Sequence, residues 1–131
     1  MSGARSAPEK GGRPEGTWGE ALAADYLRQR GYRLAAHSYQ CRFGEIDLIA
    51  WDGDILCFVE VKTRTNTDMA LPREYVTPAK QRRLLHAAQA FLLEKEWNHR
   101  PVRFDVVEIT SAGLIHIPNA FMPGMSRAGW T

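Results

Sequence analysis

Cysteine is scarce in this sequence, which has two cysteines among 131 residues, Cys41 and Cys57. They are not spaced as zinc ligands and are too few for a disulfide framework, so we expect free thiols. The four histidines also lack partners at zinc-site spacing, and we expect no catalytic role for them. No apolar run is long enough for a signal peptide or a membrane span, which indicates a cytoplasmic protein without membrane association.

The chain also has little net charge. The formal value is +2 at pH 7, so evidence for a nucleic-acid partner has to come from local groups of residues. With 44% hydrophobic residues the chain can bury one core, which predicts a single domain at residues 17–122. Residues 1–16, rich in glycine, proline and charge, predict a flexible tail, and residues 123–131 predict a loosely ordered one.

Two neighbouring segments, residues 44–50 and 58–64, place charged side chains among apolar and β-branched ones and predict paired strands. Asp52-Gly53 between them is a strong signal for a hairpin with a two-residue loop. One face of this hairpin should be wholly apolar and belong to the core. The residues of that face are Ile46, Leu48, Ala50, Ile55, Cys57, Val59 and Val61.

The polar side chains gather at the open end of this hairpin. In the predicted register Asp47 lies opposite Phe58, and Glu45 lies opposite Glu60, with Lys62 further along the same side. Like charges on neighbouring strands repel, and burial makes the repulsion several times larger. This acidic group therefore requires cations.

Two sources of positive charge are open at this stage. Lys62 and Arg64 can compensate the carboxylates in an internal ion-pair cluster. Alternatively, Mg²⁺ or Mn²⁺ binds between Asp47 and Glu60, because carboxylate oxygens from adjacent strands suit a hard cation that keeps water in its other positions. Lys62 points to the same side and would reach such a water.

Asp47 followed by Glu60-x-Lys62 on the next strand resembles the core motif of the PD-(D/E)xK nuclease superfamily. Ile46 stands where the superfamily has proline, and an apolar residue there does the same packing work. Residues 16–121 as a whole resemble the bacterial YraN-like family, whose members are assigned as endonucleases. The matching residues are Gly19-Glu20, Ala24, Tyr26-Leu27, Gly31-Tyr32, residues 44–50, residues 58–64 and Arg103-Phe104-Asp105-Val106-Val107.

The resemblance implies a catalytic set of two carboxylates and a lysine, which here are Asp47, Glu60 and Lys62. It also implies a metal contact from the backbone carbonyl of Val61 and one from an acid on the first helix, Glu20. From the residues alone, Glu20 is equally well explained as a first-turn acid stabilised by the helix dipole, and the resemblance favours the ligand. Glu45 either serves a second metal ion or anchors a basic side chain.

A second helix should begin at Thr77-Pro78, with Thr77 as its N-cap, and its first turns are basic. The dipole favours anions at that end, so a phosphodiester backbone would relieve the arrangement. The alternative is a solvated basic face. Gln81 resembles the polar helix residue of related nucleases. The expected nucleic-acid contacts are Arg42, Arg64, Lys80, Gln81, Arg82 and Arg83.

The segments together predict an α/β fold in the order helix, three strands, helix, then one or two strands. The helices should flank a central mixed β-sheet, and the resemblance implies a restriction endonuclease-like core. The expected elements are a helix at 17–30, a strand at 32–39, the hairpin, a loop at 65–76, a helix that buries Leu84, Leu85, Ala88, Phe91 and Leu92, and strands at 103–109 and 114–117.

The expected function is that of a metal-dependent endonuclease acting on nucleic acid, on DNA rather than RNA, with branched DNA among the candidate substrates. One alternative is an accessory module that keeps the nuclease fold and binds nucleic acid without cutting it. Another is a structural or partner-binding domain in which the acidic group is an ion-pair cluster. A homodimer would suit the cutting of two strands, but no repeated apolar surface in the sequence demonstrates one.

Overall fold

The computed structural model describes residues 14–64 and 76–122 of the chain. The tail predicted at 123–131, most of the one predicted at 1–16 and almost all of the loop predicted at 65–76 lie outside these residues. No helix within the described residues is long and apolar enough to cross a membrane. The elements are α1 (Pro14–Gln29), β1 (Arg33–Cys41), β2 (Gly44–Asp52), β3 (Ile55–Thr63), α2 (Pro78–Lys95), β4 (Val102–Thr110) and β5 (Gly113–Phe121).

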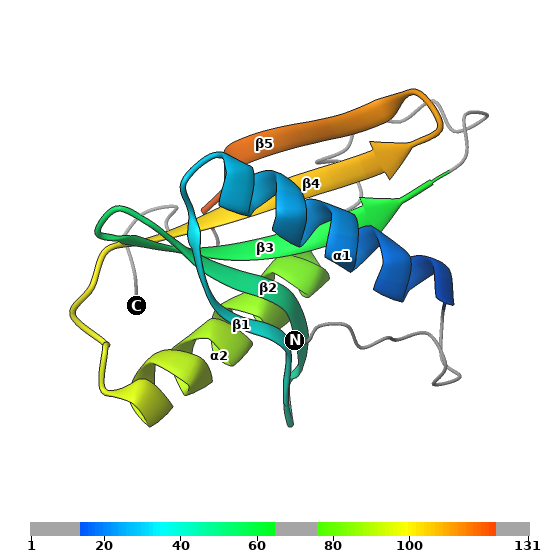
Figure 1. Cartoon of the computed structure of the whole chain (residues 1–131). Coiled ribbons are helices and arrows are strands. Elements are labelled where there is room, and N and C mark those ends of the chain that lie inside the picture. The colour runs from blue at the N-terminus through cyan, green and yellow to red at the C-terminus, as the bar shows by residue number, and fades with distance from the viewer. Residues whose placement is uncertain (1–13, 65–75, 123–131) are drawn as a thin grey trace.

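The strands form one mixed sheet in the spatial order β1-β2-β3-β4-β5. β3 and β4 are parallel, because α2 connects them as a crossover, and the other neighbours are antiparallel. α1 crosses one face of the sheet and α2 lies against the other (Figure 1). The predicted α/β fold, its element order and its flanking helices are confirmed, and they match a restriction endonuclease-like core.

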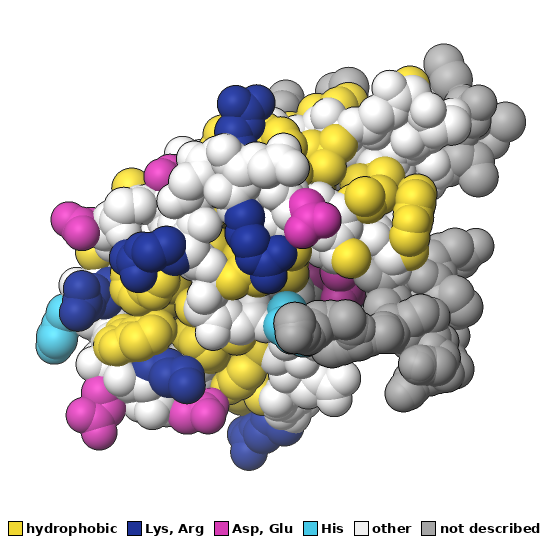
Figure 2. Space-filling view, in the orientation of Figure 1, with side chains coloured by type: hydrophobic (Ala, Val, Ile, Leu, Met, Phe, Trp, Pro, Cys, Tyr) yellow, Lys and Arg dark blue, Asp and Glu magenta, His cyan; other side chains and the backbone are white. Residues whose placement is uncertain are grey.

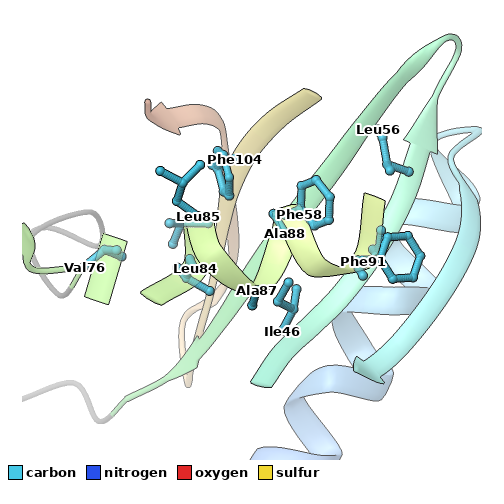
Figure 3. Packing of buried hydrophobic residues seen from close by; sticks show 12 residues of the cluster. Ile46, Leu56, Phe58, Val76, Leu84, Leu85, Ala87, Ala88, Phe91 and Phe104 are labelled. Carbon is cyan, nitrogen blue, oxygen red and sulfur yellow. The ribbon is translucent and has the colours of Figure 1, made fainter. Parts of the chain in front are cut away.

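Each face of the sheet has its own hydrophobic cluster. Leu84, Ala88 and Phe91 of α2 pack on the strands around Ile46 and Phe58 (Figure 3). The predicted buried stripe of α2 is confirmed except at its last member, Leu92, which is half-buried. On the opposite face the small residues of α1 allow a close approach to the sheet. This second cluster comprises Ala23, Ala24, Leu27, Leu48, Cys57, Val59, Val107 and Ile109.

The β2–β3 hairpin has a two-residue loop, but the predicted register is wrong. Asp52 pairs with Ile55, so the loop is Gly53-Asp54 and not Asp52-Gly53. Gly53 has a φ of 61°, which suits the first loop position of a tight hairpin. The partner of each paired β2 residue is therefore two positions further along β3 than predicted. Because a shift of two residues preserves the alternation, this change alters the partners and not the faces. The ladder ends at the Leu48–Val59 pair, so the predicted pairing of Glu45 with Glu60 does not form.

The alternation of β2 is interrupted at Asp47, and this corrects a second prediction. Ile46 belongs to the cluster under α2, whereas Leu48 belongs to the cluster under α1. An uninterrupted strand would place both on the same face, as we predicted. On the neighbouring strand, Ser38 has a φ of 51° at the position that faces Asp47 in the β1–β2 register. The sheet is therefore distorted where the acidic residues lie.

Gly19 brings the start of α1 close to the ends of β3 and β4. A Cβ atom added there would lie 2.6 Å from Thr63 Oγ1 and 3.5 Å from Ile109 Cδ1. We expect Gly19→Val to lower the free energy of unfolding by about 1–3 kcal/mol, through overpacking against the sheet. Ala21→Val is the matched control, because Ala21 is exposed on the same helix. Urea unfolding of both variants tests this; equal losses would assign the effect to the helix propensity of valine.

Candidate metal centre

Three carboxylates from α1 and β2 meet at the distorted end of the hairpin. One oxygen from each of Glu20, Glu45 and Asp47 lies within 4.8 Å of the others, and all three residues are half-buried. Ser38 Oγ donates a hydrogen bond of 3.1 Å to Glu20 Oε1, which helps to hold that side chain over the sheet. The structure thus brings Glu20 to Asp47, as the resemblance implied, and adds Glu45 to the group.

The side chain of Asp47 occupies the gap where β2 and β3 cease to pair. Its Oδ2 accepts a hydrogen bond of 2.8 Å from the backbone N–H of Val61. That N–H would otherwise lack the backbone acceptor that a continued ladder provides. The bond fixes the carboxylate of Asp47 against β3, so the backbone of Val61 lies beside the acidic group. A metal contact from the Val61 carbonyl stays a prediction.

Burial and the neighbouring carboxylates disfavour the ionised form of Asp47. Burial, and then the charge of Glu60, raise the pKa of Asp47 to about 8, with smaller contributions from Glu20 and Glu45. The hydrogen bond from Val61 opposes this rise but does not cancel it. A divalent cation would reverse the effect, because it favours the ionised carboxylates. The carboxylate oxygens, their spacing and the raised pKa of Asp47 fit a site for Mg²⁺ or Mn²⁺.

This raised pKa predicts how the stability of the metal-free protein depends on pH. In the folded state Asp47 holds its proton up to about pH 8, compared with 3.8 for an ordinary aspartate. The stabilisation is therefore complete below the ordinary value and is lost as the pH rises through the folded-state value. In EDTA, we expect the wild type to lose more stability than Asp47→Asn between about pH 5 and about pH 8.

The measurement is urea unfolding of both proteins at the two pH values. Asp54→Asn is the control, since Asp54 is an exposed aspartate in the loop of the same hairpin and should keep the wild-type pH dependence. Identical losses in the wild type and Asp47→Asn would show that Asp47 titrates normally.

Glu60 is buried, and its carboxylate is outside the group of three. Its Oε2 lies 2.5 Å from the ammonium of Lys80 on α2. We expected Lys62 and Arg64 as compensating cations, and the structure adds Lys80 as a partner of Glu60. The ion pair also explains one of the basic residues at the start of α2, because the Glu60 carboxylate on β3 compensates the charge of Lys80.

The two basic residues that follow Glu60 lie beside β4. Lys62 is half-buried, and it pairs in the parallel register with Glu108. The Glu108 side chain is fully buried and forms an ion pair with Arg64, whose side chain is 16% exposed. Arg64 is therefore held within the fold and is not displayed as a surface contact. The sequence analysis did not identify Glu108. Its position within the otherwise apolar run 106–109 was the signal that could have indicated a buried carboxylate.

The start of α2 has the predicted capping. Thr77 is the N-cap and its side chain accepts a hydrogen bond of 3.2 Å from the N–H of Lys80, with Pro78 at the first helical position. Gln81 Nε2 donates to the Val76 carbonyl at 3.0 Å, which gives Gln81 a local structural role. Its predicted nucleic-acid contact stays a prediction.

The remaining predicted contacts are arginines at the surface. Arg82 and Arg83 are exposed on α2. Arg42 is exposed in the turn between β1 and β2, with its guanidinium 5.0 Å from the ring centre of Phe43. On the face crossed by α1, basic and acidic side chains are interspersed (Figure 2). A nucleic-acid surface is therefore best sought at the start of α2 and the β1–β2 turn.

A second polar group, which the sequence analysis missed, surrounds Asp105 on β4. The Asp105 carboxylate is fully buried and accepts two hydrogen bonds from Arg103, of 2.9 and 3.0 Å. His116 Nε2 lies 2.9 Å from the same carboxylate, and the N–H of Asn119 donates to it at 2.9 Å. Burial alone would raise the pKa of Asp105, but the hydrogen bonds from His116, Arg103 and Asn119 outweigh it and lower the pKa.

The fold defines a class. A five-stranded mixed sheet flanked by two helices is consistent with the core of the restriction endonuclease-like proteins. Comparison with known sequences then identifies the family: residues 19–109 match the model described as "Uncharacterised protein family UPF0102". The chain belongs to this family, the YraN-like group, and the resemblance noted above is confirmed.

Relatives from distant bacteria support this assignment over most of the chain. A UPF0102 protein of Chlorobium limicola is 48% identical over 99 residues, covering 76% of this chain and 77% of the relative. One from Persephonella marina is 38% identical over 107 residues, with 82% and 92% covered. One from Geobacter metallireducens is 43% identical over 110 residues, with 81% and 90% covered. The similarity therefore includes the helix and strands that carry the acidic group.

Proposed function

We propose that this protein is a metal-dependent endonuclease that hydrolyses phosphodiester bonds in DNA. The observation that carries the proposal is the group of carboxylates from Glu20, Glu45 and Asp47, whose oxygens lie within 4.8 Å of one another at the parting of β2 and β3. The raised pKa of Asp47 supports it, because carboxylates crowded without a metal ion take up protons. The pattern Glu60-x-Lys62 on the adjacent strand supports the reaction class.

Glu20 and Asp47 would hold Mg²⁺ or Mn²⁺, with Glu60 and the Val61 carbonyl as further ligands and Glu45 beside them. The metal, when bound, supplies a water of lowered pKa and polarises the phosphate. The hydrogen bond from the Val61 N–H orients the Asp47 carboxylate before any ligand arrives. This preorganisation suits a reaction in which positioning and charge stabilisation dominate.

Lys62 is the proposed catalytic base or water-positioning group. It follows Glu60 by two residues on β3, so it shares the side of the strand from which Glu60 projects. Its ammonium stabilises the negative charge that develops on the phosphate, and a neutral amine there can accept a proton from the attacking water. Lys62 lies beside Glu108 in the parallel register of β3 and β4.

The DNA backbone would approach the start of α2. Lys80, Arg82 and Arg83 lie there, and the dipole of the helix favours the phosphates as well. Arg42 in the β1–β2 turn extends this surface, whereas Arg64 is left out because Glu108 holds it within the fold. The proposed setting is the cytoplasm, and a homodimer would present two such sites to a two-stranded substrate.

The test is incubation of the protein with linear, forked and four-way DNA and with single-stranded RNA, in Mg²⁺, Mn²⁺ or EDTA. Cleavage of a DNA substrate that requires the metal would support the proposal and identify the substrate structure. Binding of the same substrates without cleavage would favour the non-cutting accessory module. Neither binding nor cleavage would favour the structural or partner-binding domain.

A further inference from the structure

The position of Lys80 is unfavourable unless its charge has a specific use. It lies in the first turn of α2, which contains no acidic residue, and there the helix dipole repels a cation. Its side chain nevertheless reaches across to β3, where the ammonium lies 2.5 Å from Glu60 Oε2. The cation of this helix start is therefore directed at the acidic site.

The environment of the ion pair makes the contact strong. The Glu60 side chain is 8% exposed and that of Lys80 is 28% exposed, so water screens the pair only partly. Glu60 is also the neighbouring charge that acts most strongly on Asp47. By neutralising Glu60, the ammonium of Lys80 lowers the repulsion that the whole acidic group would otherwise suffer. The ammonium of Lys80 thus binds a carboxylate that the proposed function assigns to a divalent ion.

We propose that Lys80 is the built-in counter-cation of this site: it holds Glu60 while no metal ion is bound, and metal binding transfers Lys80 from Glu60 to a phosphate of the nucleic acid. This inference rests on the proposed function. An ammonium and a divalent ion repel each other at such short range, so they compete for the Glu60 carboxylate. The flexible side chain of lysine can move, and the helix start that it then occupies favours an anion.

Competition for Glu60 makes Lys80→Met a sharp test. Methionine keeps most of the length of the side chain and removes the charge, and the N-cap is retained because Thr77 bonds to the backbone N–H of residue 80. We expect Lys80→Met to bind Mn²⁺ about 10- to 100-fold more tightly than the wild type, measured by electron paramagnetic resonance of free Mn²⁺. The control Lys95→Met makes the same chemical change at an exposed lysine in the last turn of α2, and its affinity for Mn²⁺ should stay within about twofold of the wild type.

Thermal unfolding gives a second readout that needs no cleavage. Without metal, Lys80→Met leaves Glu60 buried beside other carboxylates, so we expect a lower Tm than the wild type. Mn²⁺ should then raise the Tm of Lys80→Met by more than it raises that of the wild type. This measurement also detects a variant that folds only when the metal is present.

DNA binding tests the second half of the transfer. In EDTA, Lys80 is occupied by Glu60 and its loss should change the affinity for DNA little. In Ca²⁺, used as a divalent ion that permits binding, Lys80→Met should weaken DNA binding by about tenfold, because the released ammonium no longer contacts a phosphate. Equal effects of the substitution in EDTA and Ca²⁺ would overturn the transfer.

The outcomes separate this inference from the proposed function. Mn²⁺ binding by the wild type with unchanged or weaker binding by Lys80→Met would overturn the inference and leave the proposed metal centre standing. Absence of Mn²⁺ binding in both proteins would remove the proposed metal centre itself. Tighter Mn²⁺ binding by Lys80→Met but not by Lys95→Met would support the role of Lys80 as counter-cation.

Discussion

Asp47→Asn is expected to lower the rate of metal-dependent DNA cleavage by about 10³-fold or more, while the protein stays folded. Asparagine keeps the shape of aspartate, and its side-chain oxygen can still accept the hydrogen bond that the Val61 N–H donates to Asp47. What it loses is the negative charge that a divalent ion requires. The metal-free variant should be no less stable than the wild type, since the pKa of Asp47 is already raised.

Two further variants make this loss interpretable. Asp54→Asn makes the same chemical change in the exposed loop of the hairpin and should cleave at the wild-type rate. Lys62→Met should lose cleavage to a similar degree but keep the increase in Tm that Mn²⁺ produces, because it removes a catalytic group and not a ligand. Wild-type cleavage by Asp47→Asn would exclude Asp47 as a ligand and reject the proposed site.

The hairpin shows how far a sequence can predict geometry. Asp52-Gly53 and Gly53-Asp54 both offer a two-residue loop, and the two registers keep every side chain on its face. Local sequence therefore predicted the strands, the crowding of acids and the faces of the strands except at Ile46. It could not choose the register, in which Ile49 pairs with Phe58 and not with Leu56. The break in alternation at Asp47 is likewise a tertiary effect, coupled to the positive φ of Ser38 on β1.

The ion pairs were harder to predict than the acids, because they join residues far apart in the chain. Glu60 and Lys80 meet only when α2 has crossed back over the sheet. Glu108 and Arg64 meet only because β3 and β4 are parallel neighbours. A pattern of residue types along one strand shows that charge must be compensated. Which cation compensates it depends on packing that no local spacing encodes.

The polar group around Asp105 was also missed because its members meet only in the folded sheet. His116 was judged by its distance in sequence from other potential zinc ligands, and by that criterion it had no partner. In the fold it contacts a carboxylate from the adjacent strand. The register of β4 and β5 shifts between Phe104 and Val106, so Asp105 lies at an irregularity of the ladder. There its carboxylate accepts a hydrogen bond from the backbone N–H of Asn119. A buried aspartate inside an apolar strand was the available signal.

Asp105→Asn is expected to lower the free energy of unfolding by about 3–5 kcal/mol, the cost of leaving one partner of a buried ion pair uncompensated. The carboxylate accepts from Arg103, His116 and Asn119 together, and a single amide oxygen cannot replace both carboxylate oxygens. The amide would also direct N–H groups at donors. Because Arg103 also bonds to side chains of β2 and of the connection between α1 and β1, the loss should spread through the fold. Its further acceptors are the side chains of Asp52 and Tyr32.

Urea unfolding at neutral pH measures this loss, with Asp25→Asn as the matched control. Asp25 pairs with Arg28 on the exposed side of α1, where water screens the charges, so that change should cost less than about 1 kcal/mol. His116→Gln removes one contact of Asp105 and should give an intermediate loss, which keeps the prediction measurable if Asp105→Asn does not fold. A wild-type unfolding midpoint for Asp105→Asn would show that the group adds no net stability.

The sign of the pH dependence distinguishes Asp105 from Asp47. The pKa of Asp105 is lowered in the folded state, so its stabilisation is present above the ordinary aspartate pKa and is lost as the pH falls through the folded-state value. The raised pKa of Asp47 acts in the opposite direction, and at higher pH. Acid should therefore destabilise the wild type more than Asp105→Asn, whereas raising the pH from about 5 to about 8 should destabilise the metal-free wild type more than Asp47→Asn. The pKa values of these two aspartates of one sheet are thus shifted in opposite directions, because Asp105 accepts several internal hydrogen bonds whereas Asp47 is buried beside other carboxylates.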